Sequence, residues 1–142
     1  MIHLEWPEAF ASGGKRGCFV HPDDPNLCIK VDYSSRGVRS TLSEAKFLQR
    51  KIIAHRIGAG APFSKFHGRV KTSLGDGSVF TLIRDHDGTI SKTLSDVIKL
   101  PLKPENHERY DVALADFRTR FLDTAVICRD IAPYNILSLI HI

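Results

Sequence analysis

Hydrophobic and polar positions alternate in short runs over the first third of the chain, a pattern typical of β-strands. Residues Leu4–Ala11 predict a first strand, in which Pro7 suits an edge position. Residues 18–20 and Leu27–Val31 predict two more strands, because each is an apolar run of strand length. The segment 21–26 between them holds two prolines, two aspartates and an asparagine, so it predicts a turn.

Apolar residues then recur at helical spacing between Thr41 and Ile57, which predicts a long helix. These residues are Leu42, Ala45, Leu48 and Ile52. Two strands, Phe66–Thr72 and Ser78–Arg84, are predicted next, joined by a turn at Gly75-Asp76-Gly77. The second of them is apolar on both faces, so we expect it in the interior of the sheet.

The last part of the chain predicts a connector followed by helices. Residues Arg84–Gly88 break the strand pattern, and Thr93–Leu100 predicts a short helix. Residues Pro104–Asp123 predict a longer helix, because proline favours the first helical position. Its expected buried stripe consists of Tyr110, Ala113, Leu114, Phe117 and Phe121. Strands followed by helices predict an α+β fold.

Composition narrows the class of protein. The chain has 142 residues, of which 42% are hydrophobic and 25% charged, as is ordinary for a globular chain with a buried core. We see neither an apolar run of membrane-spanning length nor a secretory signal. Three widely spaced cysteines favour reduced thiols and a cytoplasmic location. The net charge of +4 is spread along the chain, so we expect no membrane and no nucleic-acid partner.

Gly13, Gly14 and Gly17 form a glycine-rich turn between two predicted strands. Glycines let the backbone approach a ligand closely and present N–H groups to phosphate oxygens. A strand on each side is the context of a kinase-type glycine loop, whereas a Rossmann loop leads into a helix. A plain flexible hairpin explains the same residues.

Lys30 stands on the strand after this turn, where its ammonium could reach the phosphates of a bound nucleotide. Glu44 falls in the first turns of the predicted long helix and could hold Lys30 in an ion pair. Each residue has an ordinary alternative. A lysine on an edge strand can extend into water, and Thr41-x-x-Glu44 can be a capping box.

Asp130 and Asn135 lie five residues apart in a polar turn with apolar residues on both sides. In a phosphotransferase, such a loop supplies a carboxylate for the hydroxyl proton and an amide oxygen for a metal ion. An ordinary turn between two strands is the alternative. Asp85 and Asp87 with His86 suggest a second metal site, although their spacing is not that of a calcium loop.

In chain order, these parts resemble the protein-kinase-like fold: an antiparallel-sheet N-lobe with one long helix, then the first helices and catalytic loop of a C-lobe. The resemblance implies an N-lobe at 1–84, a hinge at 85–91 and a partial C-lobe at 92–142. More closely, the chain resembles the YrbL family, the PhoP-regulated kinase-like proteins of bacteria. That resemblance rests on Gly13-Gly14-Lys15-Arg16-Gly17-Cys18-Phe19-Val20-His21-Pro22, Cys28-Ile29-Lys30-Val31, Ile83-Arg84-Asp85-His86-Asp87-Gly88 and Asn135-Ile136-Leu137.

The resemblance implies a role for each candidate residue. Asp130 is the catalytic aspartate and Asn135 the ligand of Mg²⁺. Lys30 and the three glycines bind ATP, with Glu44 as the partner of Lys30. The implied function is phosphoryl transfer from ATP to an unknown protein or small-molecule acceptor.

Three departures from the kinase pattern lower the expected activity. Cys128 stands where kinases usually carry a histidine, and Ala132 where many carry a lysine that contacts the phosphate. The chain also stops seven residues after Asn135, before a metal-binding Asp-Phe-Gly-type element. Because one lost donor can cost about a hundredfold in rate, we expect little or no catalysis from this truncated form. The alternatives are a non-catalytic, pseudokinase-type regulatory or scaffold module, and an unrelated α+β domain.

Overall fold

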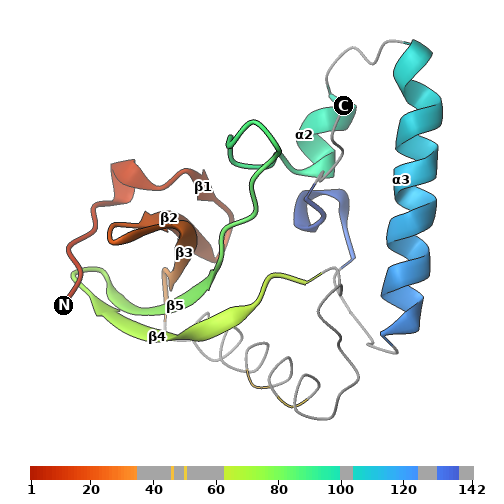
Figure 1. The fold of residues 1–142 in the computed structure, drawn as a ribbon. Helices are drawn as coiled ribbons and strands as arrows, with labels where there is room; N and C mark the ends of the chain where they lie inside the picture. The colour runs from red at the N-terminus through yellow and green to blue at the C-terminus, as the bar shows by residue number, and fades with distance from the viewer. Residues whose placement is uncertain (35–45, 47–49, 51–62, 100–103, 125–130, 138–142) are drawn as a thin grey trace. The chain divides into compact units, whose positions relative to one another are not determined.

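The computed structural model describes residues 1–34, 46, 50, 63–99, 104–124 and 131–137 (Figure 1). Described residues up to Leu82 form one compact unit, and those from Ile83 onward form a second. The lobes at 1–84 and 92–142, with a hinge at 85–91, stay a prediction. Within the described ranges, no helix combines the length and the apolar character needed to cross a membrane.

The first unit is built on an antiparallel sheet of five strands (Figure 1). The strands are β1 (Ala11–Ser12), β2 (Arg16–His21), β3 (Asp24–Asp32), β4 (Phe66–Thr72) and β5 (Gly75–Thr81). Their order in the sheet is β1-β2-β3-β5-β4, so β5 is an interior strand, as its two apolar faces predict. Together with the helices of the second unit, the sheet confirms the predicted α+β class.

Alternation along the strands gives this sheet two different faces. On the core face lie Phe19, Ile29, Val31 and Val79, which pack with Leu4 into the hydrophobic core. On the opposite face, here named the lysine face, lie Cys18, Cys28, Lys30 and Phe80. The register pairs Cys18 with Lys30 and Cys28 with Phe80, so these four side chains share one surface.

The prediction of a strand at Leu4–Ala11 is wrong. The segment forms a short 3₁₀ helix, η1 (Trp6–Glu8), and only its last residue enters a strand. Pro7 has its φ fixed at a helical value, and Glu5 and Glu8 form a capping box around the turn. Hydrogen bonds within the turn therefore satisfy the N–H groups of Glu5, Glu8 and Ala9.

The turn between β4 and β5 lies earlier than the predicted Gly75-Asp76-Gly77. Thr72 and Gly75 are paired across the hairpin, so Ser73 and Leu74 form a two-residue turn. The Thr72 hydroxyl donates a hydrogen bond to the Gly75 carbonyl at 2.7 Å. Gly75 has φ of +118°, in the left-handed region that favours glycine. Its conformation ends the turn, and the rest of the predicted turn belongs to β5.

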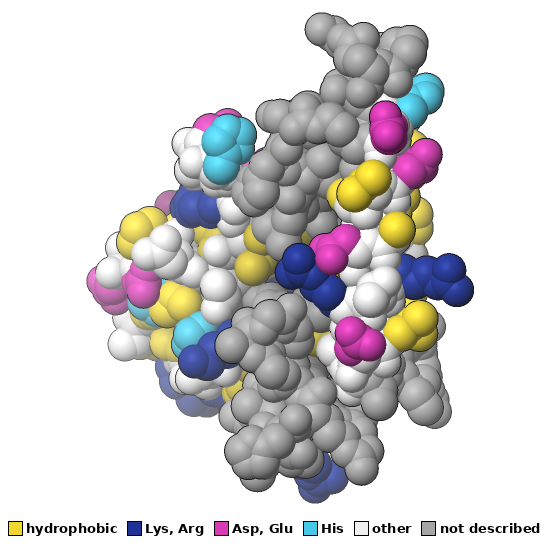
Figure 2. Space-filling model, turned by 45° about the vertical axis from the view of Figure 1, so that its right-hand side comes forward, with side chains coloured by type: hydrophobic (Ala, Val, Ile, Leu, Met, Phe, Trp, Pro, Cys, Tyr) yellow, Lys and Arg dark blue, Asp and Glu magenta, His cyan; other side chains and the backbone are white. Residues whose placement is uncertain are grey.

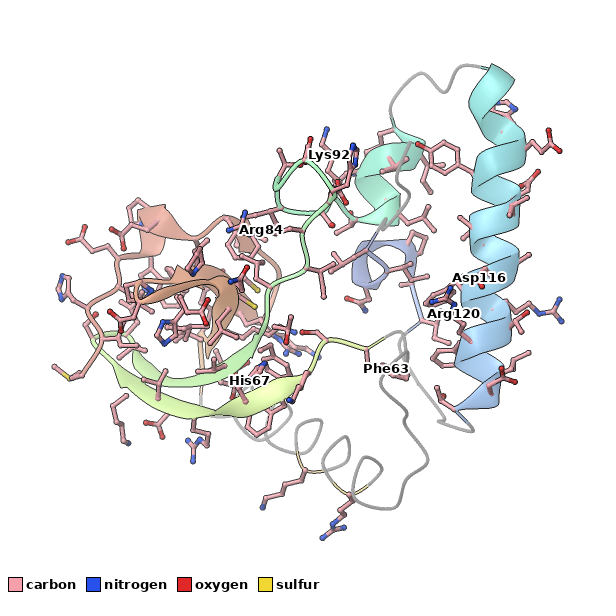
Figure 3. All side chains as sticks on the ribbon, in the orientation of Figure 1. Phe63, His67, Arg84, Lys92, Asp116 and Arg120 are labelled. Carbon is pink, nitrogen blue, oxygen red and sulfur yellow. The ribbon has the colours of Figure 1, made fainter. Side chains whose placement is uncertain are left out.

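The connector after β5 folds back on itself. β5 ends at Thr81, before the predicted end at Arg84, and Arg84 instead forms an isolated bridge with Ile90. The Arg84 guanidinium, labelled in Figure 3, donates to the Gly88 carbonyl at 2.7 Å. Gly88 has φ of +83°, which lets the chain turn sharply there. The connector is thus a closed loop held by its own hydrogen bonds.

The second unit contains α2 (Leu94–Ile98), α3 (Pro104–Asp123) and the 3₁₀ helix η2 (Pro133–Asn135). The α3 bounds are those predicted, and the expected short helix is confirmed at its centre. The predicted stripe on α3 is only half-buried, and Leu114 is 38% exposed. An ion pair between Asp116 and Arg120, 2.8 Å long, stabilises the exposed side of α3 (Figure 3).

Candidate functional site

Lys30 lies near the end of β3, opposite Cys18 on β2 and Ser78 on β5. Because β3 is an interior strand, the alternative of an edge-strand lysine is wrong. The Lys30 ammonium is 4.2 Å from the centroid of the Phe80 ring, a distance at which the ring electrons attract a cation. The sheet therefore holds a half-buried ammonium on an aromatic floor, where an anionic ligand could approach it.

Two thiols accompany Lys30 on the lysine face. Burial raises the pKa of the Cys18 thiol, and it raises the pKa of the Cys28 thiol to about 11 from a usual value near 9. The positive charge of Lys30 opposes both shifts without reversing them. Folding thus favours the protonated Cys28 thiol, and this contribution to stability is lost as the pH rises from about 9 through 11.

We expect Cys28, which is buried, to react with iodoacetamide more slowly than the half-buried Cys18 at pH 8. The reason is that only about one in a thousand Cys28 side chains is a thiolate three pH units below its pKa. Between pH 8 and 9, its rate should rise about tenfold. Mass-spectrometric mapping of native protein labelled for increasing times measures each site separately. Equal rates at Cys18 and Cys28 would contradict the prediction.

The glycine-rich turn links β1 to β2, the strand context that was predicted. Ser12 pairs with Gly17, and the Gly13 N–H donates to the Arg16 carbonyl at 3.0 Å. That amide is therefore used inside the hairpin in this conformation. Gly13 and Gly14 are exposed, and a Cβ on either would meet no atom within 4 Å. The tip of the hairpin is thus open to a ligand.

Gly17 differs from the other two glycines because it is buried. A Cβ built on Gly17 would lie 3.0 Å from Cζ3 of Trp6 and 3.3 Å from Cε2 of Phe19. Gly17 pairs with Val31, so it belongs to the core face, whereas Lys30 belongs to the lysine face. The structure gives Gly17 a packing reason to be glycine, and its contact with a nucleotide stays a prediction.

Of the three remaining predicted site residues, the structure describes only Asn135. Glu44 and Asp130 lie outside the described residues, as does most of the predicted helix Thr41–Ile57, of which Lys46 and Arg50 are helical. Asn135 ends η2 with an exposed side chain, and its N–H donates to the Ala132 carbonyl at 2.8 Å. Because Asn135 belongs to the second unit, its convergence with Lys30 stays a prediction.

The carboxylates of the connector bind within their own loop. Asp85 accepts a hydrogen bond from the Ser91 hydroxyl at 2.6 Å. Asp87 accepts from the hydroxyl and the N–H of Thr89, at 2.7 and 2.9 Å, and these bonds lower the pKa of the Asp87 carboxyl. Among the described residues, no three His, Cys, Asp or Glu side chains gather to hold a metal ion.

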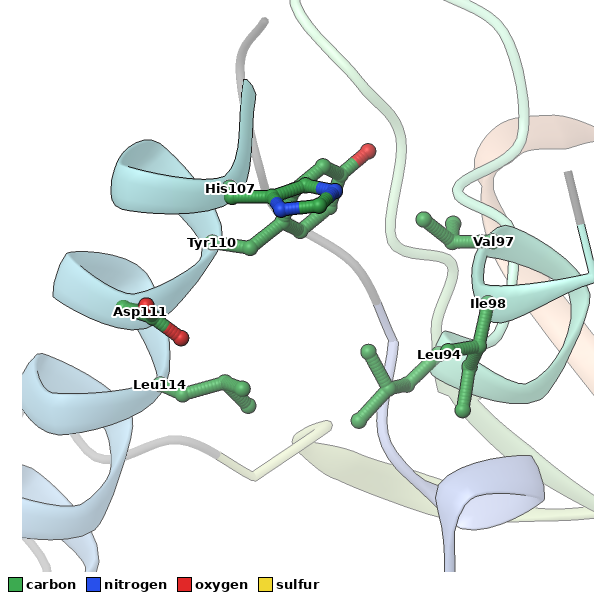
Figure 4. A pocket seen from close by; sticks show the side chains of 7 residues that line it. All are labelled: Leu94, Val97, Ile98, His107, Tyr110, Asp111 and Leu114. Atoms are coloured by element: carbon green, nitrogen blue, oxygen red, sulfur yellow. The ribbon is translucent and has the colours of Figure 1, made fainter. Parts of the chain in front are cut away.

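Elsewhere on the surface, positive and negative side chains are mixed. Lys and Arg side chains are interspersed with Asp and Glu on the face that Figure 2 shows, as the spread of charge along the sequence predicts. The second unit also has an open hollow of about 280 Å³ (Figure 4). It is lined by Leu94, Val97, Ile98, His107, Tyr110, Asp111 and Leu114. Its largely apolar lining suits packing better than phosphate chemistry.

Two residues that matter to this geometry were not identified from the sequence. The sequence pattern predicts Phe80 only as an apolar strand residue, yet its ring lies under the Lys30 ammonium. The pattern places Trp6 on a predicted strand, yet its indole covers Gly17. A signal for Trp6 was available, since a lone tryptophan in a Glu-Trp-Pro-Glu segment indicates a capped turn with a large apolar side chain.

Comparison with known proteins identifies the family. Two relatives, named "Uncharacterized protein YrbL" in Escherichia coli strain K12 and in Shigella flexneri, are each 27% identical to this chain over 139 residues. The alignment covers 96% of the chain, which spans 65% of the length of either relative. No solved structure matches it. The family described as PhoP regulatory network protein YrbL matches residues 2–140, and the chain therefore belongs to this family.

Proposed function

We propose that this chain is an ATP-binding protein of kinase-like fold that binds the nucleotide phosphates beside Lys30. The observation that carries the proposal is the register of β2 and β3, which sets Lys30 opposite Cys18, just after the glycine hairpin. A lysine in this position can bind phosphate oxygens while the hairpin backbone approaches them. The partial burial of Lys30 strengthens its attraction for phosphate, because water and salt screen a half-buried charge less than an exposed one.

The proposed chemistry of the whole protein is phosphoryl transfer. Mg²⁺ prefers oxygen ligands, and the exposed amide of Asn135 fits that preference. Asp130 would orient the acceptor hydroxyl, which belongs to a protein or a small molecule. Because the chain spans 65% of its relatives' length, transfer is proposed for a protein of their full length.

A regulatory module without catalysis is the second candidate. Its support is the loop sequence, in which Cys128 and Ala132 replace residues that kinases use to brace the loop and to contact phosphate. The family description, a PhoP regulatory network protein, also fits a regulatory role. In this case nucleotide binding at Lys30 would persist, and its consequence would be a change in a binding surface.

Calorimetric titration with ATP and Mg²⁺ tests the nucleotide site. We expect Lys30→Ala to weaken binding at least about tenfold, because a hydrogen bond to a charged group contributes about 1.5–3 kcal/mol. The matched control is Lys65→Ala, which removes an exposed lysine of the same unit and should leave affinity unchanged. Equal affinities for the wild type and Lys30→Ala would overturn the proposal.

Radiolabelled phosphate transfer by a full-length relative separates the two candidates. Transfer that vanishes when the aspartate matching Asp130 becomes asparagine supports the phosphotransferase. Binding of ATP without transfer, by a relative that carries the matching lysine, supports the regulatory module.

A further inference from the structure

The segment before β1 is tied across the core face at two points. Ile2 forms a parallel bridge with Thr72, and Leu4 is buried in the core. The Ser73 side chain contacts both polar groups of the Leu4 backbone, accepting from its N–H at 2.9 Å and donating to its carbonyl at 2.8 Å. These bonds fix the segment at the β4–β5 turn, far along the sheet from β1.

The same segment ends against the base of the glycine hairpin. The Trp6 indole covers Gly17, where an added Cβ would lie only 3.0 Å from it. It also contacts the ring of Phe19, with centroids 5.6 Å apart, and that of Tyr33, at 4.8 Å. Tyr33 follows β3, and its N–H donates to the Lys15 carbonyl at 2.9 Å. Trp6 therefore contacts β2, just after the glycine hairpin, and also the residue that follows the neighbouring strand β3.

We infer that Trp6 is a positioning residue of the nucleotide site, which acts through Gly17 and Tyr33 to fix the glycine hairpin; this inference rests on the proposed function. The indole lies on the core face, whereas Lys30 lies on the lysine face, so Trp6 acts from the side opposite the ligand. A hairpin ordered in advance loses less freedom when phosphate binds, which raises affinity without a new contact. A Cβ at position 17 would require the Trp6 indole to move by a few tenths of an ångström, so the two residues are packed closely.

Hydrogen exchange and nucleotide titration of the 142-residue chain test the inference. In Trp6→Ala, we expect exchange at residues 11–18 to accelerate about tenfold or more, while exchange in the β4–β5 hairpin is unchanged. Affinity for ATP with Mg²⁺ should fall about threefold to tenfold. Trp6→Phe keeps a ring over Gly17 and should restore at least half of both losses. Phe10→Ala, which removes a 38% exposed ring from the same segment, should have neither effect.

Trp6 is the chain's one tryptophan, so its emission reports on this contact directly. In the wild type, titration with ATP and Mg²⁺ should shift that emission with the same midpoint as the calorimetric binding curve. Exchange that accelerates equally over the whole sheet, or affinity unchanged in Trp6→Ala, would overturn the inference. If the wild type binds no nucleotide, the proposed function and the nucleotide part of the inference both fail. The exchange at residues 11–18 then still decides whether Trp6 orders the hairpin.

Discussion

Replacing Phe80 by alanine is expected to lower the free energy of unfolding by about 3–5 kcal/mol, the usual cost of removing a fully buried phenylalanine. Phe80 has 0% exposure, and its ring centroid lies 5.3 Å from that of Phe66. The cavity would open under β5, an interior strand with a partner on each side, where relaxation is limited. Urea unfolding followed by circular dichroism measures the loss.

The matched control is Phe10→Ala, since Phe10 is 38% exposed and its loss should cost less than the loss of the fully buried Phe80. Phe80→Leu separates packing from the effect of the ring on Lys30. It keeps most of the volume and should cost less than about 1.5 kcal/mol, yet it removes the ring electrons 4.2 Å from the ammonium. We expect its affinity for ATP to fall while the fold persists. A similar loss of stability in Phe80→Ala and Phe10→Ala would contradict the full burial of the Phe80 side chain.

The sheet was predictable where apolar runs decide the pairing. The apolar run at Leu27–Val31 predicts β3, and the two apolar faces of β5 predict its interior position, because only buried strands require both faces to be apolar. The predictions that were wrong fall where local chemistry competes with strand pairing. Glu5 and Glu8 close a capping box, so the segment around Pro7 turns instead of extending.

The candidate site was predictable only in its local parts. Lys30 is foreseeable as a cation within an apolar strand, and the glycine turn as a hairpin. The ring under Lys30 and the indole on Gly17 come from cross-strand register and from a contact between distant segments, which no local pattern encodes. The convergence of Lys30 with Asp130 and Asn135 depends on how two units meet, so the sequence supports it only through the resemblance to kinases.

Gly77 illustrates why residue type alone misplaced the hairpin turn, and it carries the second large effect. The Gly-Asp-Gly sequence is typical of turns, but Gly77 is buried in β5 opposite Val31 and Val70. A Cβ there would lie 2.5 Å from Cγ2 of Ile29, whose side chain is fully buried. The glycine is therefore needed for close packing between neighbouring strands rather than for a turn.

We expect Gly77→Ala to lower the free energy of unfolding by about 1–3 kcal/mol, because the added methyl overpacks a core that cannot yield freely. Gly14→Ala is the matched control: a Cβ there meets nothing within 4 Å, so stability should change by no more than about 0.5 kcal/mol. Ile29→Leu removes the branched methyl that the new Cβ would strike. In a double-mutant cycle measured by urea unfolding, it should therefore recover about 1 kcal/mol of the Gly77→Ala loss. Strict additivity of the two substitutions would show that the clash with Ile29 is not the cause.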